Sequence, residues 1–361
     1  MRTVTVTASS QYQVLIGKGL IRQCGRLLEE LADPCRVAII ADDRVDSLYG
    51  NIVHASLMYE GFSVARFTFP HGEASKNLTI LGEILEFLAE QQFSRSDMIL
   101  ALGGGVTGDL AGFAAAVYLR GVPFVQIPTT LLAAVDSSVG GKTGIDLKGG
   151  KNLAGAFHQP AMVICDPDVF QSLSEEEFQN GISEMLKYGV LGDPELFDKL
   201  AGGDFRDPKT CDMQALEEMI ETCIAMKRDI VAKDEFDTGI RQFLNLGHTL
   251  GHGIEKESRY QISHGRAVAI GLYLIARAAE RAEIAEKGIA RQIRRALENN
   301  GLPWECAFTP SAVAKAAMND KKRRGGKIHF VFPQKIGSCR IIPIPVDAME
   351  EMVEDAMSRE E

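Results

Sequence analysis

The first half of the chain alternates short apolar runs with amphipathic helical stretches. Val37–Ile40, Met98–Leu102 and Phe124–Ile127 have the composition of buried strands, and Ser63–Phe69 is a further strand candidate. Helical patterns separate these strands, and the clearest of them is Leu78–Glu90. This alternation predicts a parallel α/β sheet that is covered by helices on both faces.

Helical patterns dominate the chain after residue 173. Ser174 and Glu177 have the spacing of a capping box, which predicts a helix start. The further helices that we predict are Met213–Asp229, Gln242–Glu257, Arg266–Arg281 and Ala285–Asn300. We therefore expect two domains. Residues 1–173 form an α/β domain with a Rossmann-like, nucleotide-binding sheet, and 174–361 form a mainly α-helical domain for metal and substrate.

Composition excludes several classes of protein. The formal net charge of −10 argues against nucleic-acid binding. No apolar run reaches the length of a membrane span, and the first residues alternate as in a strand rather than forming a signal peptide. The seven cysteines are odd in number and lack Cys-x-x-Cys spacing, which favours reduced thiols in a cytoplasm.

A glycine-rich turn follows the predicted strand Met98–Leu102. Its sequence is Gly103-Gly104-Gly105-Val-Thr-Gly108-Asp109, and its amides and the next helix, predicted from Leu110, can cradle a diphosphate. The same turn also occurs where a helix only packs on a sheet. If a nucleotide binds here, Asp42 at the end of the first parallel strand is the candidate for its ribose, because ligands bind at the carboxyl ends of such strands.

Lysines follow glycines in several segments. The stretch Asp136–Thr143 lacks the first glycine of a P-loop, which excludes that type of NTPase. Lys142 and Lys151 each follow a glycine, which suits either a mobile anion-binding loop or solvated loop lysines. The basic segment Asp320–Lys327 likewise suits either a solvated loop or a lid over an anionic substrate.

Three of the seven histidines fall within seventeen positions. His248 and His252 are i,i+4 neighbours on a predicted helix, and His264 follows a polar break. Imidazoles placed in this way can bind a divalent metal ion, and zinc is the default ion for nitrogen ligands. Two histidines at this spacing are, however, more often ordinary surface or core residues. Position 249 is Thr, so the His-Glu-x-x-His pattern of zinc proteases is absent.

A catalytic zinc needs a third protein ligand, and Glu184 is our candidate. Its neighbours are apolar, so the helix that carries it should be mostly buried, where a carboxylate without a role is costly. Lys187 lies on the same face, which is also the spacing of a surface ion pair. Gly247, Gly251 and Gly253 lower helix stability, which indicates that something approaches this backbone closely.

Taken together, these segments resemble the 3-dehydroquinate synthase family over about residues 37–342. The resemblance implies NAD and a divalent metal, usually zinc with cobalt as the alternative, together with a cytoplasmic homodimer. It implies conversion of 3-deoxy-D-arabino-heptulosonate 7-phosphate to 3-dehydroquinate and phosphate by oxidation, phosphate elimination, re-reduction and aldol closure. The motifs that carry it are Gly103–Gly112, Pro128–Thr143, Gly150–Asn152, Glu184–Gly189, Asn245–His252, His264-Gly265 and Asp320–Lys322.

The resemblance also implies a role for each site residue. Metal ligands are Glu184, His248 and His264. Catalytic groups are Lys187, His252, Asp136 and Lys142. Residues that hold the substrate carboxylate and phosphate are Arg120 (reaching a neighbouring subunit), Lys142, Asn152, Lys227, Arg241, Asn245 and Lys327. NAD contacts are Asp42, Glu73, Lys76, Gly104, Gly105, Asp109, Thr129, Thr130, Lys142 and Lys151.

Two other enzyme classes stay open at this point. One is another sugar-phosphate cyclase, whose substrate lacks the carboxylate, and the other is a metal-dependent polyol dehydrogenase that would release NADH. Lys227, Arg241 and Asn245 are all present, and a substrate carboxylate needs such partners. A sugar-acid phosphate is therefore the substrate class we predict.

Overall fold

The structure is a computed structural model that describes residues 1–321 and 326–358. The chain forms two compact units. Unit 1 consists of Met1–Leu173 and Met213–Phe236, and unit 2 of Ser174–Asp212 and Asp237–Glu361. Across the described residues, no helix combines the length and apolarity needed to cross a bilayer.

Unit 1 is built on a seven-stranded sheet of order β1-β2-β9-β6-β5-β3-β4. Its strands are β1 Arg2–Thr7, β2 Gln11–Ile16, β3 Arg36–Asp42, β4 Ser63–Phe69, β5 Met98–Gly103, β6 Phe124–Pro128 and β9 Met162–Cys165. β1 and β2 pair antiparallel, and every other pair in this sheet is parallel. The predicted parallel α/β sheet is confirmed.

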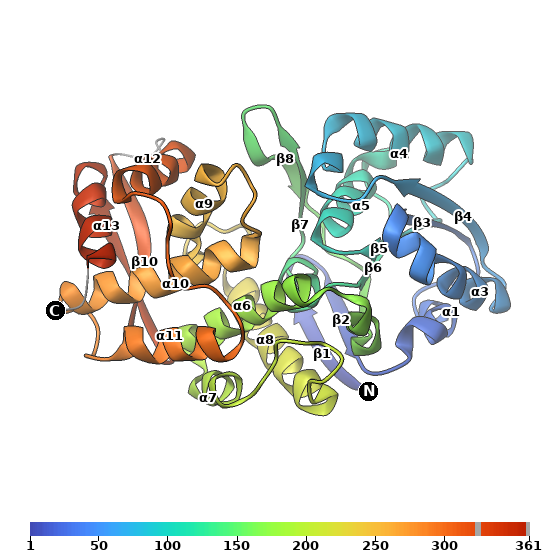
Figure 1. Cartoon of the computed structure of the whole chain (residues 1–361). Coiled ribbons are helices and arrows are strands. Elements are labelled where there is room, and N and C mark those ends of the chain that lie inside the picture. Colours follow the sequence, from blue (N-terminus) through green and yellow to red (C-terminus); the bar gives the residue numbers. More distant parts are fainter. Residues whose placement is uncertain (322–325, 359–361) are drawn as a thin grey trace. The chain divides into compact units, whose positions relative to one another are not determined.

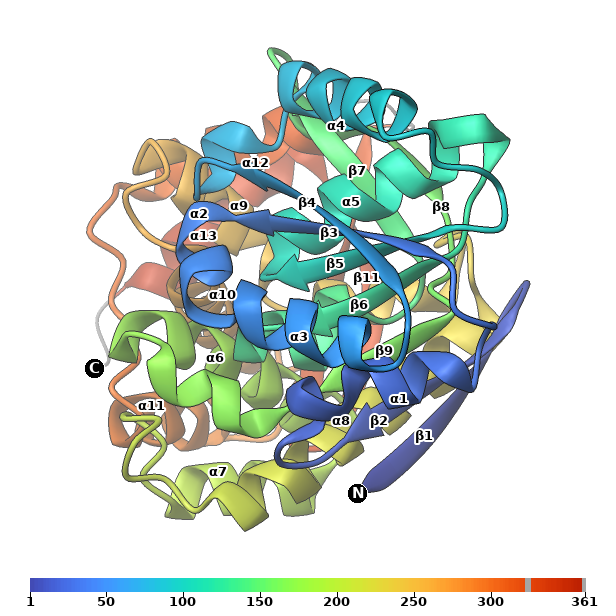
Figure 2. The ribbon, with the colours of Figure 1, turned by 90° about the vertical axis from the view of Figure 1, so that its right-hand side faces the viewer.

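Helices lie on both sides of this sheet, with α4 and α5 on one side and α1 and α3 on the other in both ribbon views (Figures 1 and 2). The helices of unit 1 are α1 Cys24–Glu29, α2 Asp43–Val45, α3 Asn51–Tyr59, α4 Leu78–Glu90, α5 Gly105–Val117 and α8 Met213–Lys233. Ile84 and Leu88 of α4 and Leu110 of α5 are buried in one core with Ile40 and Ile99 of the sheet. The apolar strand runs exist because both of their faces are covered.

The segment Met213–Phe236 is a correction to the predicted division at residues 173 and 174. Its helix, α8, belongs to unit 1 although it follows two helices of unit 2 in sequence. Arg2 of β1 forms ion pairs with Glu218 and Glu221 of α8 at 3.1 and 2.6 Å, and Leu216 and Ile220 are buried. Helical periodicity predicts the helix but not the surface against which its apolar face packs.

The two Gly-Lys segments form a hairpin rather than the predicted mobile loop. β7 Lys142–Leu147 pairs antiparallel with β8 Gly150–Phe157, and Lys142 and Lys151 lie on these strands. Gly144 and Gly155 face each other in this pair, and a Cβ on Gly155 would lie 2.1 Å from the carbonyl oxygen of Thr143. The glycines therefore permit close strand pairing here, in addition to any turn.

Unit 2 is mainly helical, as predicted (Figure 1). Its helices are α6 Glu175–Gly192, α7 Pro194–Gly202, α9 His248–Glu257, α10 His264–Arg281, α11 Ile289–Asn299, α12 Pro310–Lys321 and α13 Met349–Met357. The hairpin of β10 Lys327–Lys335 and β11 Ser338–Pro345 completes it. Residues 322–325 of the predicted basic segment lie outside the described residues.

Two helices of unit 2 begin later than predicted. The helix predicted from Gln242 begins at His248, because a 3-10 turn, η7 Ile240–Asn245, is followed by Gly247 at φ 77°. The helix predicted from Ala285 begins at Ile289, directly after Gly288 at φ 91°. A residue with positive φ ends one helical run and starts another, and glycine adopts that conformation without steric cost.

Candidate active site

Glu184 lies in the middle of α6, a helix that is buried on all sides. Ser174 caps this helix by accepting a hydrogen bond from the backbone N–H of Glu177. Every residue from Phe178 to Leu191 is buried, and Glu184 is 0% exposed. A carboxylate in such surroundings needs cationic partners to offset its lost hydration.

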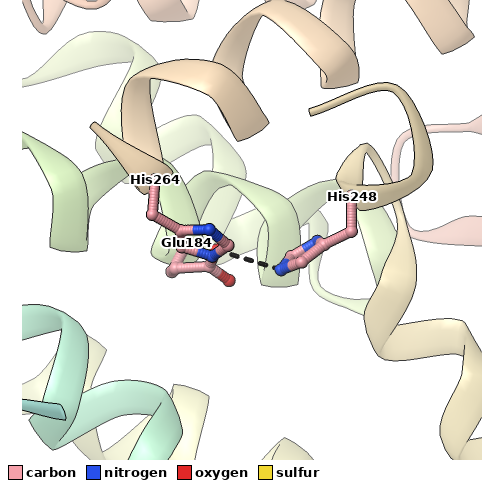
Figure 3. Close-up of side chains that lie close together, drawn as sticks. All are labelled: Glu184, His248 and His264. Carbon is pink, nitrogen blue, oxygen red and sulfur yellow. Dashed lines mark ion pairs between the residues drawn. The ribbon is translucent and has the colours of Figure 1, made fainter. Parts of the chain in front are cut away.

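Two histidines from other helices face this carboxylate (Figure 3). His248 is the first residue of α9 and His264 the first residue of α10. The Nε2 atom of His248 lies 3.4 Å from Glu184 Oε1, and the Nε2 atom of His264 lies 3.5 Å from the same oxygen. One donor atom from each of these residues falls within 4.8 Å of the other two, so the three predicted metal ligands do come together.

Glycines allow the three helices to approach closely enough. A Cβ on Gly265 would lie 2.4 Å from Asn180 Cα, one turn before Glu184 on α6. A Cβ on Gly271 of α10 would lie 2.1 Å from the carbonyl oxygen of Gly247. The close approach that we expected near Gly247 and Gly251 is thus made by the backbone of α10, and that near Gly253 by α12 at Val313.

Both histidines have their other ring nitrogen held by an acceptor. His248 Nδ1 lies 3.1 Å from the carbonyl oxygen of Leu246, and His264 Nδ1 lies 3.1 Å from Glu255 Oε2. A carbonyl or carboxylate oxygen only accepts, so each Nδ1 carries the proton. In the neutral rings, each Nε2 therefore directs a lone pair toward the carboxylate of Glu184.

Burial lowers the pKa of His248 to about 3, against the opposite influence of Glu184, so this ring is neutral at physiological pH. Burial also lowers the pKa of His264, but hydrogen bonds and charges from Glu184 and Glu255 raise it above its ordinary value overall. The neutral His248 ring has no proton on Nε2, so a bound cation would offset the repulsion between this nitrogen and the Glu184 Oε1 atom at 3.4 Å. The donor set therefore fits a divalent ion with mixed nitrogen and oxygen ligands.

Lys187 and His252 lie at the edge of the same cluster. Lys187 Nζ forms an ion pair with Glu184 Oε2 at 2.5 Å and lies 4.8 Å from the centre of the Tyr188 ring. Lys187 is 1% exposed, which makes this a buried pair and not the surface pair that its spacing also suited. The ring centre of His252 lies 5.5 Å from that of His248 and 5.8 Å from that of His264.

Unit 1 brings the predicted nucleotide contacts to the carboxyl ends of its strands. β3 lies between β4 and β5, so the chain leaves β3 to one side and later returns to its other side. Ligands of doubly wound sheets bind at such a reversal of strand order. Asp42 ends β3, and its Oδ1 atom caps α2 by accepting from the backbone N–H groups of Arg44 and Val45.

The turn after β5 is shorter than predicted, because α5 begins at Gly105 and not at Leu110. Its first amides therefore lie at the strand end, where they suit a diphosphate. Among the described residues, the buried hydroxyl of Thr129 after β6 has no hydrogen-bond partner, and neither has that of Ser137. Unused hydroxyls beside this helix start fit a bound cofactor that would complete their hydrogen bonds.

Charged residues predicted to contact NAD form one network in unit 1. Lys76 Nζ lies 2.6 Å from Asp109 Oδ2 and 2.6 Å from Asn152 Oδ1. Lys151 Nζ lies 3.5 Å from Glu73 Oε1. Burial lowers the pKa of Lys76, but Asp109 and Glu73 raise it above its ordinary value overall, so the ammonium stays charged. Asn152, predicted to bind substrate, is thus a neighbour of this network.

Lys227 and Asp136 form a second pair in unit 1. Lys227 Nζ donates to the backbone oxygen of Asp136 at 2.6 Å and pairs with its Oδ1 at 2.7 Å. Lys227 can contact Asp136, although 91 residues separate them in the sequence, because α8 is part of unit 1. Asp136 lies in the short helical turn η5 Ala133–Ser137.

The remaining predicted residues are spread over both units. Arg241 is buried in η7, and Asn245 ends that turn three residues before His248. Lys142 and Lys327 are exposed first residues of β7 and β10. Arg120 is exposed and has φ 67°, an uncommon backbone conformation for a residue with a side chain.

Comparison with known proteins decides the family. The family model for the N-terminal part of 3-dehydroquinate synthases matches residues 66–180, and the family model for the C-terminal part matches residues 181–323. The 3-dehydroquinate synthase of Streptococcus sanguinis is 44% identical over 344 residues, which is 95% of this chain and 96% of that protein.

The chain belongs to the 3-dehydroquinate synthase family. The family assignment inferred from the sequence motifs is confirmed.

Solved structures share this fold over nearly the whole chain. A 2-epi-5-epi-valiolone synthase from Streptomyces hygroscopicus, with NAD⁺ and Zn²⁺ bound, has a TM-score of 0.88 at 24% identity, covering 99% of this chain and 98% of that one. A 2-deoxy-scyllo-inosose synthase, complexed with carbaglucose-6-phosphate, NAD⁺ and Co²⁺, has a TM-score of 0.87 at 23% identity, covering 98% and 99%. At these identities the likeness concerns the fold.

Two residues of this 3-dehydroquinate synthase family member were missed by the sequence reasoning. Glu255 contacts a predicted metal ligand, and Ser137 has an unused hydroxyl beside Gly105. Helical spacing from His248 to His252 and on to Glu255, at i, i+4 and i+7, was a signal that could have indicated Glu255. For Ser137 the signal was only its place next to Asp136.

Proposed function

We propose that the chain converts 3-deoxy-D-arabino-heptulosonate 7-phosphate to 3-dehydroquinate and phosphate in the shikimate pathway. NAD and a divalent metal ion are its cofactors in this proposal. The supporting observation is the buried carboxylate of Glu184 with the Nε2 atoms of His248 and His264 at 3.4 and 3.5 Å, in a chain of this family. Zinc is the ion we favour, with cobalt as the second choice.

In unit 2, the side chains of Glu184, His248 and His264 would bind the metal ion. When bound, the ion would act as a Lewis acid on a substrate hydroxyl, and NAD would accept and return a hydride. Lys187 holds the second oxygen of Glu184 and so fixes the orientation of the carboxylate. His252, half-buried beside the two histidine rings, is placed to exchange a proton with a substrate hydroxyl.

Anionic groups of the substrate need local positive charge, because the whole chain carries a formal charge of −10. In unit 2 we assign this role to Arg241 and Lys327, and in unit 1 to Lys142 and Lys227. The neutral amides of Asn245 and Asn152 would add hydrogen bonds. Charge-assisted hydrogen bonds to carboxylate and phosphate are about twice as strong as neutral ones. We further propose a homodimer in which Arg120 reaches the substrate phosphate of a neighbouring subunit.

We propose that NAD binds in unit 1 near the carboxyl ends of the strands of the large sheet. Its contacts there would be Asp42, Glu73, Lys76, Gly104, Gly105, Asp109, Thr129 and Thr130, together with Lys142 and Lys151 of the β7–β8 hairpin. The helix start at Gly105 supports a position for the diphosphate. The unused hydroxyl of Thr129 supports a cofactor contact beside it.

Phosphate release from three sugar phosphates tests the proposed function. The metal-loaded protein with NAD should release phosphate from 3-deoxy-D-arabino-heptulosonate 7-phosphate at least about 100-fold faster, by kcat/KM, than from heptulose 7-phosphate or glucose 6-phosphate. The reason is that a site built for a carboxylate leaves its own polar groups unpaired when that group is missing. Faster release from either carboxylate-free sugar would assign the chain to another cyclase activity.

A further inference from the structure

Glu255 is a buried carboxylate to which the reaction described above gives no role. It lies on α9 and is 4% exposed. Its side chain follows His248 and His252 on the same face of the helix, at i+7 and i+3. Its Oε2 atom lies 3.1 Å from the Nδ1 atom of His264, across the contact between α9 and α10.

The two imidazoles near Glu184 are arranged alike. Each presents Nε2 to Glu184 Oε1, and each has an acceptor at 3.1 Å from Nδ1. For His248 that acceptor is the backbone carbonyl of Leu246, whereas for His264 it is the side chain of Glu255. Metal-bound histidines almost always donate their second N–H to such an acceptor, which sets the tautomer and raises the basicity of the ligand nitrogen.

We infer that Glu255 is a positioning residue, which holds the Nδ1–H of His264 so that Nε2 remains directed at the metal ion. This inference rests on the proposed metal site and adds a residue to it. His264 needs such a partner because it is the first residue of α10 and its side chain is a third exposed. Ser263 and Gly265 fix the backbone on α6 near Asn180, but they leave the imidazole ring free to rotate.

A different role for Glu255, as a ligand of a second metal ion, must be compared with this one. His252, Glu255 and His264 also offer donor atoms within 4.8 Å of one another, so Glu255 would be a ligand if a second ion bound there. In that case Nδ1 of His264 would lose its proton to coordinate the ion. The 3.1 Å contact with Glu255 and the matching contact at His248 favour the positioning role.

Metal affinity and stoichiometry of four proteins test the inference. The full-length wild type is compared with Glu255→Ala, Glu255→Gln and the control Glu257→Ala, an exposed carboxylate on the same helix. Each protein is stripped with a chelator, checked for folding by circular dichroism, and titrated with Zn²⁺ against a competing chelator. Co²⁺-loaded samples are examined by NMR for the exchangeable Nδ1–H protons of bound histidines.

We expect one ion per chain in the wild type and in Glu257→Ala, with equal affinity. Glu255→Ala should bind Zn²⁺ about 10- to 100-fold more weakly. One of the two shifted Nδ1–H resonances of the Co²⁺ sample should then exchange faster with solvent. Glu255→Gln keeps an oxygen acceptor and should recover part of the affinity together with the slower exchange of this Nδ1–H proton, and the exchange rate separates the hydrogen bond from packing.

Three results would overturn the inference. Unchanged affinity and exchange in both Glu255 variants, with a loaded wild type, would remove Glu255 alone and leave the proposed function intact. Two ions in the wild type and one in Glu255→Ala would make Glu255 a ligand of a second ion. A folded wild type that binds no ion would overturn the proposed function and this inference together.

Discussion

The variant His248→Ala is expected to lose both its metal ion and its turnover. His248 contributes one of three donors, and its Nε2 atom faces a fully buried carboxylate. Changes to groups that only support a ligand already cost about 10- to 100-fold in affinity or activity. Removing the ligand itself should therefore lower kcat/KM by more than about 100-fold and leave Zn²⁺ substoichiometric after gel filtration.

The matched control for this experiment is His329→Ala. His329 is an exposed histidine on β10 of the same unit, so its loss removes an imidazole without touching the ligand set. Metal content by atomic absorption and initial phosphate release are measured side by side for both variants. A His248→Ala protein that retained one ion per chain would remove His248 from the ligands.

A second large effect is expected on stability when Lys187 is replaced by methionine. The substitution leaves the buried carboxylate of Glu184 without the ammonium at 2.5 Å. Removing one partner of a buried ion pair costs about 3–5 kcal/mol in stability, because the other charge is left buried without compensation. In the presence of a chelator, we expect a loss of this size in the free energy of unfolding, measured by urea titration.

The double variant Glu184→Gln with Lys187→Met provides the internal control. Both charges are then removed, so part of the stability should return although two side chains have changed. Added Zn²⁺ should reduce the deficit of Lys187→Met alone, because the ion supplies positive charge beside Glu184. Equal unfolding midpoints for wild type and Lys187→Met in chelator would show that the pair does not stabilise the folded chain.

Much of the fold followed from periodicity. Strand β4 and helix α4 have the predicted bounds, because each has a clear pattern and ends in residues that interrupt it. The β7–β8 hairpin was missed, since its glycines resemble loop residues until their pairing across two strands is known. The membership of α8 in unit 1 was missed for a related reason, as an amphipathic pattern does not identify its partner surface.

The candidate site was predictable to a similar degree. Glu184 and the histidine cluster stood out because a carboxylate among apolar neighbours and closely spaced histidines are unusual, and the family resemblance then selected Glu184, His248 and His264 as the predicted ligands. The pairs Lys76–Asp109 and Lys227–Asp136 join residues far apart in the chain, so only the fold could reveal them. Glu255 escaped for a different reason, because a glutamate near a helix end is usually solvated and its burial depends on α10.

The fate of NAD during turnover tests the central claim most directly. Metal-loaded protein is given 3-deoxy-D-arabino-heptulosonate 7-phosphate and an amount of NAD far below that of the substrate. Phosphate and NADH are followed together. If NAD is reduced and reoxidised within each catalytic cycle, phosphate should exceed the added NAD many-fold while free NADH does not accumulate. NADH that accumulates until all of the added NAD is consumed would contradict the cyclase mechanism, and NADH formed without release of phosphate would favour a polyol dehydrogenase.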